Sequence, residues 1–330
     1  MKTFQHANAH SVAEAIQLMS GHAGRAKLLA GGTDLLGLLK TGSQPVFPEI
    51  LINIKSIEGL DAIEKNTQGL HLGAAAKLAD IARSPLVKET CPIVAKAAES
   101  VAMPQIRNMG TLAGNLAQET RCWYYRYPDS IGGRIMCRRK GEGPCLAVKG
   151  DNRFHAIFGA KKCFAVCPSD MAVALAALDA QITIVGPKGE RVMPVMDFYH
   201  ALGNALASDE IITRILIPQP DAGNYQVFLK HRVRESIDFA VVSLAMVCTM
   251  REGKCVKARI VLGAVAPGPY RAEQAETVLM NRPLTAETAE AAVSGAVLLS
   301  GNGYKVELVK ALVKTAAAMK CQGGDGCCGA

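Results

Sequence analysis

The stretch Lys27-Leu-Leu-Ala-Gly-Gly-Thr-Asp34 reads as a short buried strand that turns through two glycines into the start of a helix. Glycine lets the backbone approach a ligand closely, and the first amides of a helix are unpaired donors at the positive end of its dipole. This arrangement suits the negatively charged pyrophosphate of a dinucleotide. Similar turns occur without any ligand, and the spacing matches neither the G-x-G-x-x-G nor the Walker pattern.

A second glycine-rich turn, Met109-Gly-Thr-Leu-Ala-Gly-Asn115, offers the same chemistry from another part of the chain. Two such turns on either side of a small α/β unit are more specific than one. The sequence therefore predicts that backbone amides at Gly31, at Gly32 and around Gly114 hold phosphate groups together.

The segments around these turns predict an α+β fold. A chain of 330 residues is too long for one ordinary core. Ser11-Val-Ala-Glu14 is a capping box for a helix that ends near Gly21, and Ser169 caps another helix through Leu178. A boundary between domains is expected at 218–223. Further strands or helices are expected at 34–40, at 51–54, on either side of a turn at 64–69, and at 76–83, 91–101, 181–185, 211–217, 225–232, 241–250, 255–265, 271–280 and 305–319.

Composition narrows the class of protein. Hydrophobic residues make up 49% of the chain and charged residues 20%, as in a folded protein. The net charge of +8 comes from scattered Lys and Arg with only 5% aromatic residues, which indicates a mildly basic surface and no nucleic-acid partner. No apolar run approaches the roughly 20 residues of a membrane span. The N-terminus lacks the apolar run of a secretion signal, so a cytoplasmic location is expected.

Five of the eleven cysteines fall between residues 122 and 167, in a glycine-rich region that lacks regular patterning. The cytosol keeps thiols reduced, which argues against a disulfide framework. A long irregular loop inside a compact domain needs something to organise it, and a metal site is the usual answer. Structural zinc and plain free thiols remain alternatives, although no C-x-x-C pair is present. The scattered cysteines read as small buried hydrophobes, and the tail at 321–330 reads as flexible.

Three strings carry a resemblance to a known family: AGGTDLL near residue 30, GTLAGNL near residue 111, and PSD at 168–170. They resemble the FAD-binding subunits of the xanthine dehydrogenase or molybdenum hydroxylase family. That family includes carbon monoxide dehydrogenase medium subunits, aldehyde oxidoreductases and 4-hydroxybenzoyl-CoA reductase. The segments 228–230, 234–238 and 261–266 resemble the C-terminal domain that closes over the flavin in the same family.

The resemblance implies a two-subdomain FAD-binding fold of the PCMH type over residues 1–220, divided into 1–57 and 58–220, with an iron–sulfur insertion at 120–165. A smaller α+β domain would occupy 221–320. The residues implied to contact FAD fall into three groups. The first turn would wrap the pyrophosphate and ribityl portions through Leu28, Leu29, Ala30, Gly31, Gly32, Thr33 and Asp34. The second wall would contain Thr111, Gly114 and Asn115, with Gln118 near the phosphates. Asp170 would hold the adenosine end, and Leu216 and Lys230 would lie close to the isoalloxazine ring.

The insertion is similar to the extra loop of 4-hydroxybenzoyl-CoA reductase β subunits and of some aldehyde oxidoreductase flavin subunits, which bind a [4Fe–4S] cluster. Four thiolates suit such a cluster. The resemblance implies Cys122, Cys137, Cys145 and Cys163 as ligands. Cys167 is the fifth candidate, but its place directly before Pro168-Ser-Asp favours a packed free thiol.

The function implied is a flavin and iron–sulfur electron-transfer subunit. The chain shows no molybdopterin site and no plant-type ferredoxin spacing. Those parts would come from a molybdopterin-binding large subunit and a [2Fe–2S] small subunit, in a dimer of heterotrimers. Three alternatives stay open: an aldehyde oxidoreductase flavin subunit, a self-sufficient flavin oxidase of the vanillyl-alcohol-oxidase type, and a zinc-stapled binding module without catalytic activity.

Overall fold

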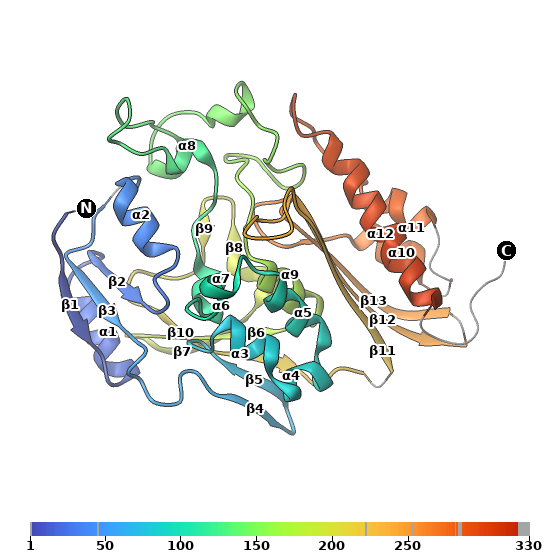
Figure 1. Cartoon of the computed structure of the whole chain (residues 1–330), viewed down its shortest axis with the longest axis horizontal. Coiled ribbons are helices and arrows are strands. Elements are labelled where there is room, and N and C mark those ends of the chain that lie inside the picture. The colour runs from blue at the N-terminus through green and yellow to red at the C-terminus, as the bar shows by residue number, and fades with distance from the viewer. Residues whose placement is uncertain are drawn as a thin grey trace.

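The computed structural model describes residues 2–322 apart from positions 45, 222, 253, 281 and 283–285, and side chains through residue 319. The paired cysteines Cys327 and Cys328 of the expected tail lie outside the described residues. Figure 1 shows three main sheets that follow one another from the N-terminal end to the C-terminal end of the molecule. No helix in the described part of the chain is long and apolar enough to cross a membrane.

The N-terminal unit is a three-stranded parallel sheet with the strand order β1-β3-β2. Its helices follow the sequence signals closely. The side chain of Ser11 accepts a hydrogen bond from the amide of Glu14, as the capping box predicts. The elements are β1 (Gln5–Asn8), α1 (Val12–Gly21), β2 (Ala26–Leu29), α2 (Leu35–Thr41) and β3 (Ile50–Asn53).

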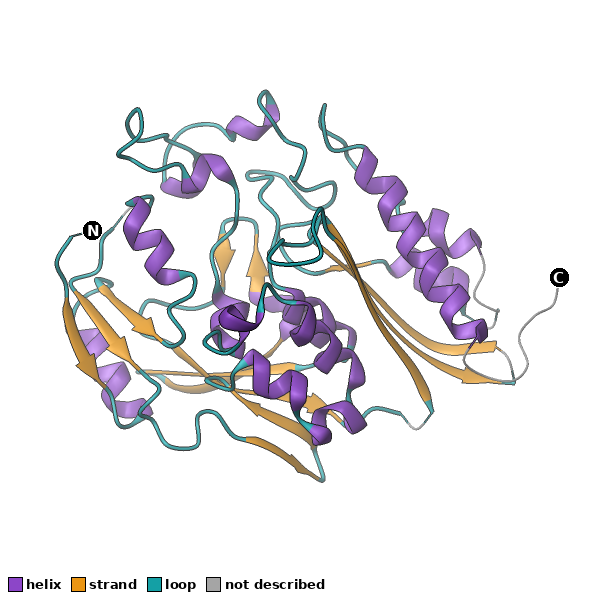
Figure 2. Ribbon diagram, in the orientation of Figure 1, coloured by secondary structure: helices purple, strands orange, loops and turns teal. Residues whose placement is uncertain are grey.

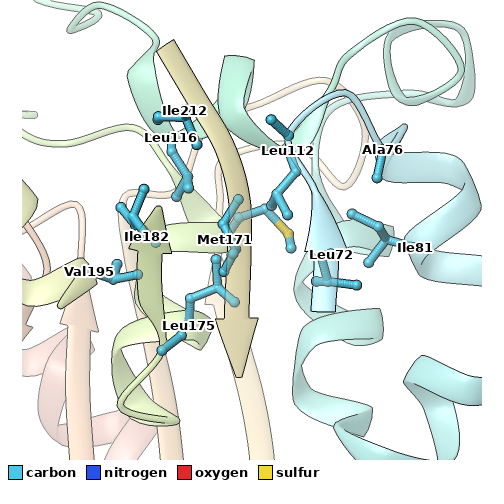
Figure 3. Packing of buried hydrophobic residues seen from close by; sticks show 14 of the residues in the cluster. Leu72, Ala76, Ile81, Leu112, Leu116, Met171, Leu175, Ile182, Val195 and Ile212 are labelled. Atoms are coloured by element: carbon cyan, nitrogen blue, oxygen red, sulfur yellow. The ribbon is translucent and has the colours of Figure 1, made fainter. Parts of the chain in front are cut away.

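The central unit is a five-stranded antiparallel sheet with the order β4-β5-β10-β6-β7, covered by helices (Figure 2). Apolar side chains from the sheet and from two of its helices interdigitate, among them Leu72, Leu116, Met171, Leu175 and Ile182 (Figure 3). The elements are β4 (Ile63–Asn66), β5 (Gly69–Gly73), α3 (Leu78–Arg83), α4 (Pro85–Thr90), α5 (Pro92–Ser100), α6 (Pro104–Arg107), α7 (Leu112–Ala117), α9 (Asp170–Ala177), β6 (Gln181–Gly186), β7 (Gly189–Pro194) and β10 (Ile211–Pro218). A small hairpin, β8 (Tyr199–His200) with β9 (Gly203–Asn204), precedes β10.

The C-terminal unit is a four-stranded antiparallel sheet with helices on its outer face (Figure 1). Helix α9 of the central unit lies against its inner strands, so the sheet is covered on both sides. A second hydrophobic cluster fills the space between the sheet and the outer helices. The elements are β11 (Asn224–His231), β12 (Val242–Arg251), β13 (Lys254–Gly263), β14 (Tyr270–Arg271), α10 (Glu273–Leu279), α11 (Ala286–Ala291) and α12 (Tyr304–Gln322).

The insertion leaves the central unit after α7 and returns before α9. Apart from α8 (Trp123–Arg126) and 3-10 turns at 138–140 and 146–148, it has no regular structure. Its own core is small: Tyr125 and Cys137 pack with Leu38 of α2, and Cys122 borders them. In Figure 1 the insertion lies at the top of the molecule, near α2 and the N-terminal end of α12.

The expected strands and helices with apolar periodicity are present, within a few residues of their predicted ends. Among the elements not expected from the sequence are the edge strands β1 and β7 and the short helices α4 and α11. The strands β1 and β7 are polar edge strands that pair on one side only, so alternation of apolar residues is weak in them. Helix α11 is a single short stretch that is stabilised by its contacts with α10 and α12.

Candidate functional site

The first glycine turn joins β2 to α2 and touches the second turn directly. A Cβ atom on Gly31 would lie 2.0 Å from the carbonyl oxygen of Met109, so only glycine allows this approach. Gly32 has a φ of +70°, in the left-handed region that favours glycine. Among the described residues, the amides of Gly31, Gly32 and Thr33 donate no hydrogen bond to the protein. The turn therefore presents free donors next to the start of a helix.

The second turn is built differently. The amides of Leu112 and Ala113 donate to carbonyl oxygens of the segment 74–76, and the amide of Gly114 donates to the Thr111 hydroxyl. A Cβ on Gly114 would lie 2.8 Å from that hydroxyl oxygen, so glycine is needed for the cap itself. The amides of Leu112, Ala113 and Gly114 in the second turn are therefore already used within the chain, unlike those of the first turn. The second turn supports the first one by packing.

Asp34 ties the first turn to the base of the insertion. It occupies the N-cap position of α2, but its carboxylate makes no capping hydrogen bond. One carboxylate oxygen lies 2.6 Å from Arg126 and 2.9 Å from Arg121, and the other accepts from the amide of Glu119 at 2.9 Å. Arg139 of the insertion pairs with Glu119 at 3.0 Å. No local sequence pattern predicts these pairings, because the partners lie more than 80 residues from Asp34.

Two residues that the resemblance assigned to opposite ends of FAD are in direct contact. Lys230 lies 2.6 Å from Asp170, and both side chains are buried. Burial raises the pKa of Asp170 in spite of the neighbouring ammonium group. The predicted roles of Asp170 at the adenosine end and of Lys230 near the ring thus fall on two side chains that form one ion pair. Leu216 lies in β10 between His71 and Gln181.

The remaining predicted flavin residues surround the second turn. Ser169 joins this group because its hydroxyl donates to the Asn115 side chain at 2.6 Å. The Gln118 amide donates to the Asn115 carbonyl, and its oxygen accepts from Arg121. Leu28 and Leu29 belong to β2, and Ala30 follows it. The structure therefore brings together the residues predicted at 28–34 and at 111–118.

A cavity of about 360 Å³ lies where the central unit, the insertion and the C-terminal unit meet. Arg121 forms part of its wall and stacks over the ring of Phe239, with 4.4 Å from the guanidinium carbon to the ring centre. Arg121 also bonds to Asp34, so the cavity adjoins the first glycine turn. Its lining includes Trp123, Phe154, His155, Ser169, Asp170 and Asp238.

The four predicted cysteine ligands converge on a second, smaller cavity within the insertion. They come from segments that are far apart in the sequence, and all four are free thiols: Cys122, Cys137, Cys145 and Cys163. Cys145 and Cys163 share a hydrogen bond, which lowers the pKa of Cys145 to about 6 and raises that of Cys163. In the described part of the chain, no three His, Cys, Asp or Glu side chains are placed to hold a single metal ion.

Cys167 lies outside this group of thiols. It is buried in the main core and lines the larger cavity, and burial raises its pKa to about 12. Its position is that of the packed thiol expected from the sequence. Cys122 and Ala165 belong to the walls of both cavities, so the two spaces are separated by little more than one side chain.

A buried positive charge lies in the insertion near Asp129 and Cys137. Lys140 is 4% exposed, and its ammonium group has no hydrogen-bond partner among the described residues. Burial lowers its pKa, and the nearby Asp129 and Cys137 raise it. A buried cation without a partner is costly, which indicates that a negatively charged group belongs beside it.

The returning half of the insertion is clamped to the C-terminal unit. Asn152 donates to Ala147 and Ser300, and accepts from the amide of Gly301. Lys305, at the start of α12, is fully buried and donates to the carbonyl oxygens of Phe154 and Ala264. Burial lowers the pKa of Lys305 to about 7. These anchors were not anticipated from the sequence, because Asn and Lys are ordinary surface residues in most positions.

The geometry defines a flavoprotein site, and comparison with known proteins identifies the family. The family model described as the FAD binding domain in molybdopterin dehydrogenase matches residues 2–220. The CO dehydrogenase flavoprotein C-terminal domain matches residues 228–299. The first match covers more than half of the chain, so this protein belongs to the FAD-binding subunits of the molybdenum hydroxylase family.

Individual relatives agree with this assignment. The chain is 36% identical to the aldehyde oxidoreductase FAD-binding subunit PaoB of Escherichia coli K12, over 84% of this chain and 86% of the relative. It is 29% identical to the nicotinate dehydrogenase FAD-subunit of Eubacterium barkeri, over 80% and 75% of the two chains. A solved structure of carbon monoxide dehydrogenase from Hydrogenophaga pseudoflava superposes with a TM-score of 0.76 at 26% identity, covering 97% of this chain and 98% of the other.

These findings confirm the FAD-binding fold with its C-terminal domain and the role as the flavoprotein subunit of an oxidoreductase. The closer likeness to 4-hydroxybenzoyl-CoA reductase, the iron–sulfur cluster and the individual FAD contacts stay predictions.

Proposed function

We propose that this chain is a two-cofactor electron-transfer subunit, which holds FAD at the first glycine turn and a [4Fe–4S] cluster among the thiols of the insertion. The observation that carries the proposal is the convergence of Cys122, Cys137, Cys145 and Cys163 on one cavity. That cavity shares the Cys122 side chain with the larger cavity beside the glycine turn.

The residues present fit FAD. The free amides of Gly31, Gly32 and Thr33 suit its pyrophosphate, and the cavity beside Arg121 is large enough and sufficiently apolar for the flavin ring. Bound FAD supplies both one-electron and two-electron chemistry. The protein's part is to fix the phosphates with backbone donors and to cover the ring with the loop that carries Phe239.

The residues of the insertion also fit an iron–sulfur cluster. Four thiolates are the ligand set of a [4Fe–4S] cluster, and each would bind a different iron. Cys145 and Cys163, which share a hydrogen bond here, would separate when the cluster binds. A single zinc ion would need all four sulfur atoms at about 2.3 Å from one point. The unpartnered ammonium of Lys140 suits a cluster that carries negative charge. When bound, the cluster passes single electrons.

The partners proposed are a molybdopterin-binding large subunit and a [2Fe–2S] small subunit, in a dimer of heterotrimers. The names of the relatives, FAD-binding subunits and medium chains, support an enzyme of several subunits. The identity of 36% with an aldehyde oxidoreductase subunit supports the alternative of an aldehyde substrate for the assembled enzyme. The 4-hydroxybenzoyl-CoA reductase-like function stays a prediction from the sequence. The cytoplasmic location remains a prediction.

The test is a cofactor count on the complex purified without oxygen. We expect one FAD per chain of this type, and four irons in addition to those of the small subunit. Cys137→Ser and Cys145→Ser should each remove the four additional irons and leave FAD bound. Cys167→Ser is the matched control: its thiol is buried but lies outside the smaller cavity, and it should keep all the iron.

Three results would contradict the proposal. A protein that neither holds flavin nor takes it up would contradict the proposed binding of FAD. One zinc per chain in place of iron would show a structural metal site. Full iron content in the Cys137→Ser variant would show that the ligand set is wrong.

A further inference from the structure

We infer that His155 is a positioning residue for the proposed cluster, which donates a hydrogen bond from Nε2 to the Cys122 sulfur and thereby raises the cluster's reduction potential. This inference rests on the proposed function. It assigns to His155 a role that the four cysteines do not cover.

The contact itself is short. Nε2 of His155 lies 3.3 Å from Sγ of Cys122, within hydrogen-bonding range for sulfur. A thiolate that binds iron has no proton to donate, so the arrangement that makes a bond places the ring proton on Nε2.

The ring is held firmly in this orientation. It meets Trp123 edge to face, with 5.6 Å between ring centres, and lies 6.1 Å from the ring of Tyr124. The backbone amide of His155 donates to Asn152, and its carbonyl accepts from Asn302. The anchors to the C-terminal unit therefore fix both sides of the histidine backbone. Such support is typical of residues that orient a metal ligand from outside the metal's own coordination shell.

The hydrogen bond between His155 and Cys122 lies where it can affect electron transfer between the two proposed cofactors. His155 and Cys122 both line the larger cavity, and Cys122 also lines the thiol cavity. The hydrogen bond thus falls between the two proposed cofactors. Hydrogen bonds to cluster sulfurs are among the factors that set the potential. Reduction adds negative charge to the cluster, and a donor stabilises the more negative state.

The experiment is a potentiometric titration of the assembled complex, which follows the cluster by its low-temperature electron paramagnetic resonance signal. His155→Leu replaces the N–H donor by an apolar side chain. We expect the ratio of reduced to oxidised cluster at a fixed potential to fall about tenfold, which corresponds to about 59 mV for a one-electron couple. His155→Gln restores an N–H donor and should recover most of the shift.

Phe154→Leu is the matched control. Phe154 lines the same cavity and contacts Trp123, but its ring makes no polar contact, so the potential should not move. Full iron content with an unchanged potential in His155→Leu would overturn the inference and leave the proposed function intact. Loss of iron in both His155→Leu and His155→Gln would also overturn it, because the histidine would then be needed to hold the cluster. A wild-type complex without the four additional irons would overturn the proposed function itself.

Discussion

The first glycine turn and the cysteine insertion are the two proposed cofactor sites, and they are built in opposite ways. The turn is made of backbone on two regular elements, and its position is fixed by the close approach of Gly31 to Met109. The insertion is made of side chains on irregular backbone, with a core of only a few residues. Its position is fixed by outside contacts, to Asp34 at its start and to α12 at its end.

The difference indicates which parts of the molecule are complete without their ligand. The glycine turn has its shape, and only its free amides await a partner. The insertion has converging thiols and a Lys140 ammonium without a hydrogen-bond partner among the described residues, which is why we propose an occupant for it. We therefore expect changes in the two regions to act on different quantities, namely flavin affinity at the turn and overall stability at the anchors.

The largest loss of unfolding free energy is expected at the buried ion pair between Asp170 and Lys230, where the central and C-terminal units meet. Asp170→Asn leaves the buried charge of Lys230 without its partner, which typically costs about 3–5 kcal/mol of unfolding free energy. Denaturant unfolding measures this change. The double variant with Asp170→Asn and Lys230→Met should regain most of the loss, because no charge then remains buried. Equal loss in the single and double variants would show that the ion pair is not the cause.

The second largest effect is expected on FAD affinity at the first glycine turn. Gly31→Ala places a Cβ at 2.0 Å from the Met109 oxygen, so the two turns must move apart. We expect FAD affinity to fall on the order of a hundredfold, or about 2.7 kcal/mol, while iron content stays unchanged. Gly37→Ala in α2 is the control, since nothing lies within 4 Å of its Cβ. Flavin titration of the apoprotein distinguishes them, and equal affinities would contradict the assigned role of the turn.

The smallest effect concerns the anchor of the insertion. Lys305 has its pKa lowered to about 7 by burial, so between pH 7 and the ordinary lysine value the unfolded chain binds more protons than the folded one. Unfolding free energy should therefore rise with pH in this window, by about 2 kcal/mol between pH 7 and 9. Lys305→Met should abolish this contribution to the rise. An identical pH dependence in the variant would show that the Lys305 amine is not the titrating group.

Much of the fold could be predicted from local patterns. The capping box at Ser11 and the N-cap at Ser169 begin helices, and the apolar runs at 211–217 and 241–250 form strands. Edge strands such as β7 escaped prediction because one-sided pairing leaves their pattern polar. Local pattern also failed to separate the two glycine turns. The second turn resembles the first in sequence, but its amides at Leu112, Ala113 and Gly114 already donate within the chain.

Residue type and short spacing were enough to predict a glycine-lined phosphate site and a group of thiols in this chain. The pairing of Asp34 with Arg126, the ion pair of Asp170 with Lys230, and the contact of His155 with Cys122 appear only in the folded structure. These contacts join residues that are distant in sequence. They depend on the path of an irregular loop, which is set by its anchors on other elements and carries no periodic pattern of its own.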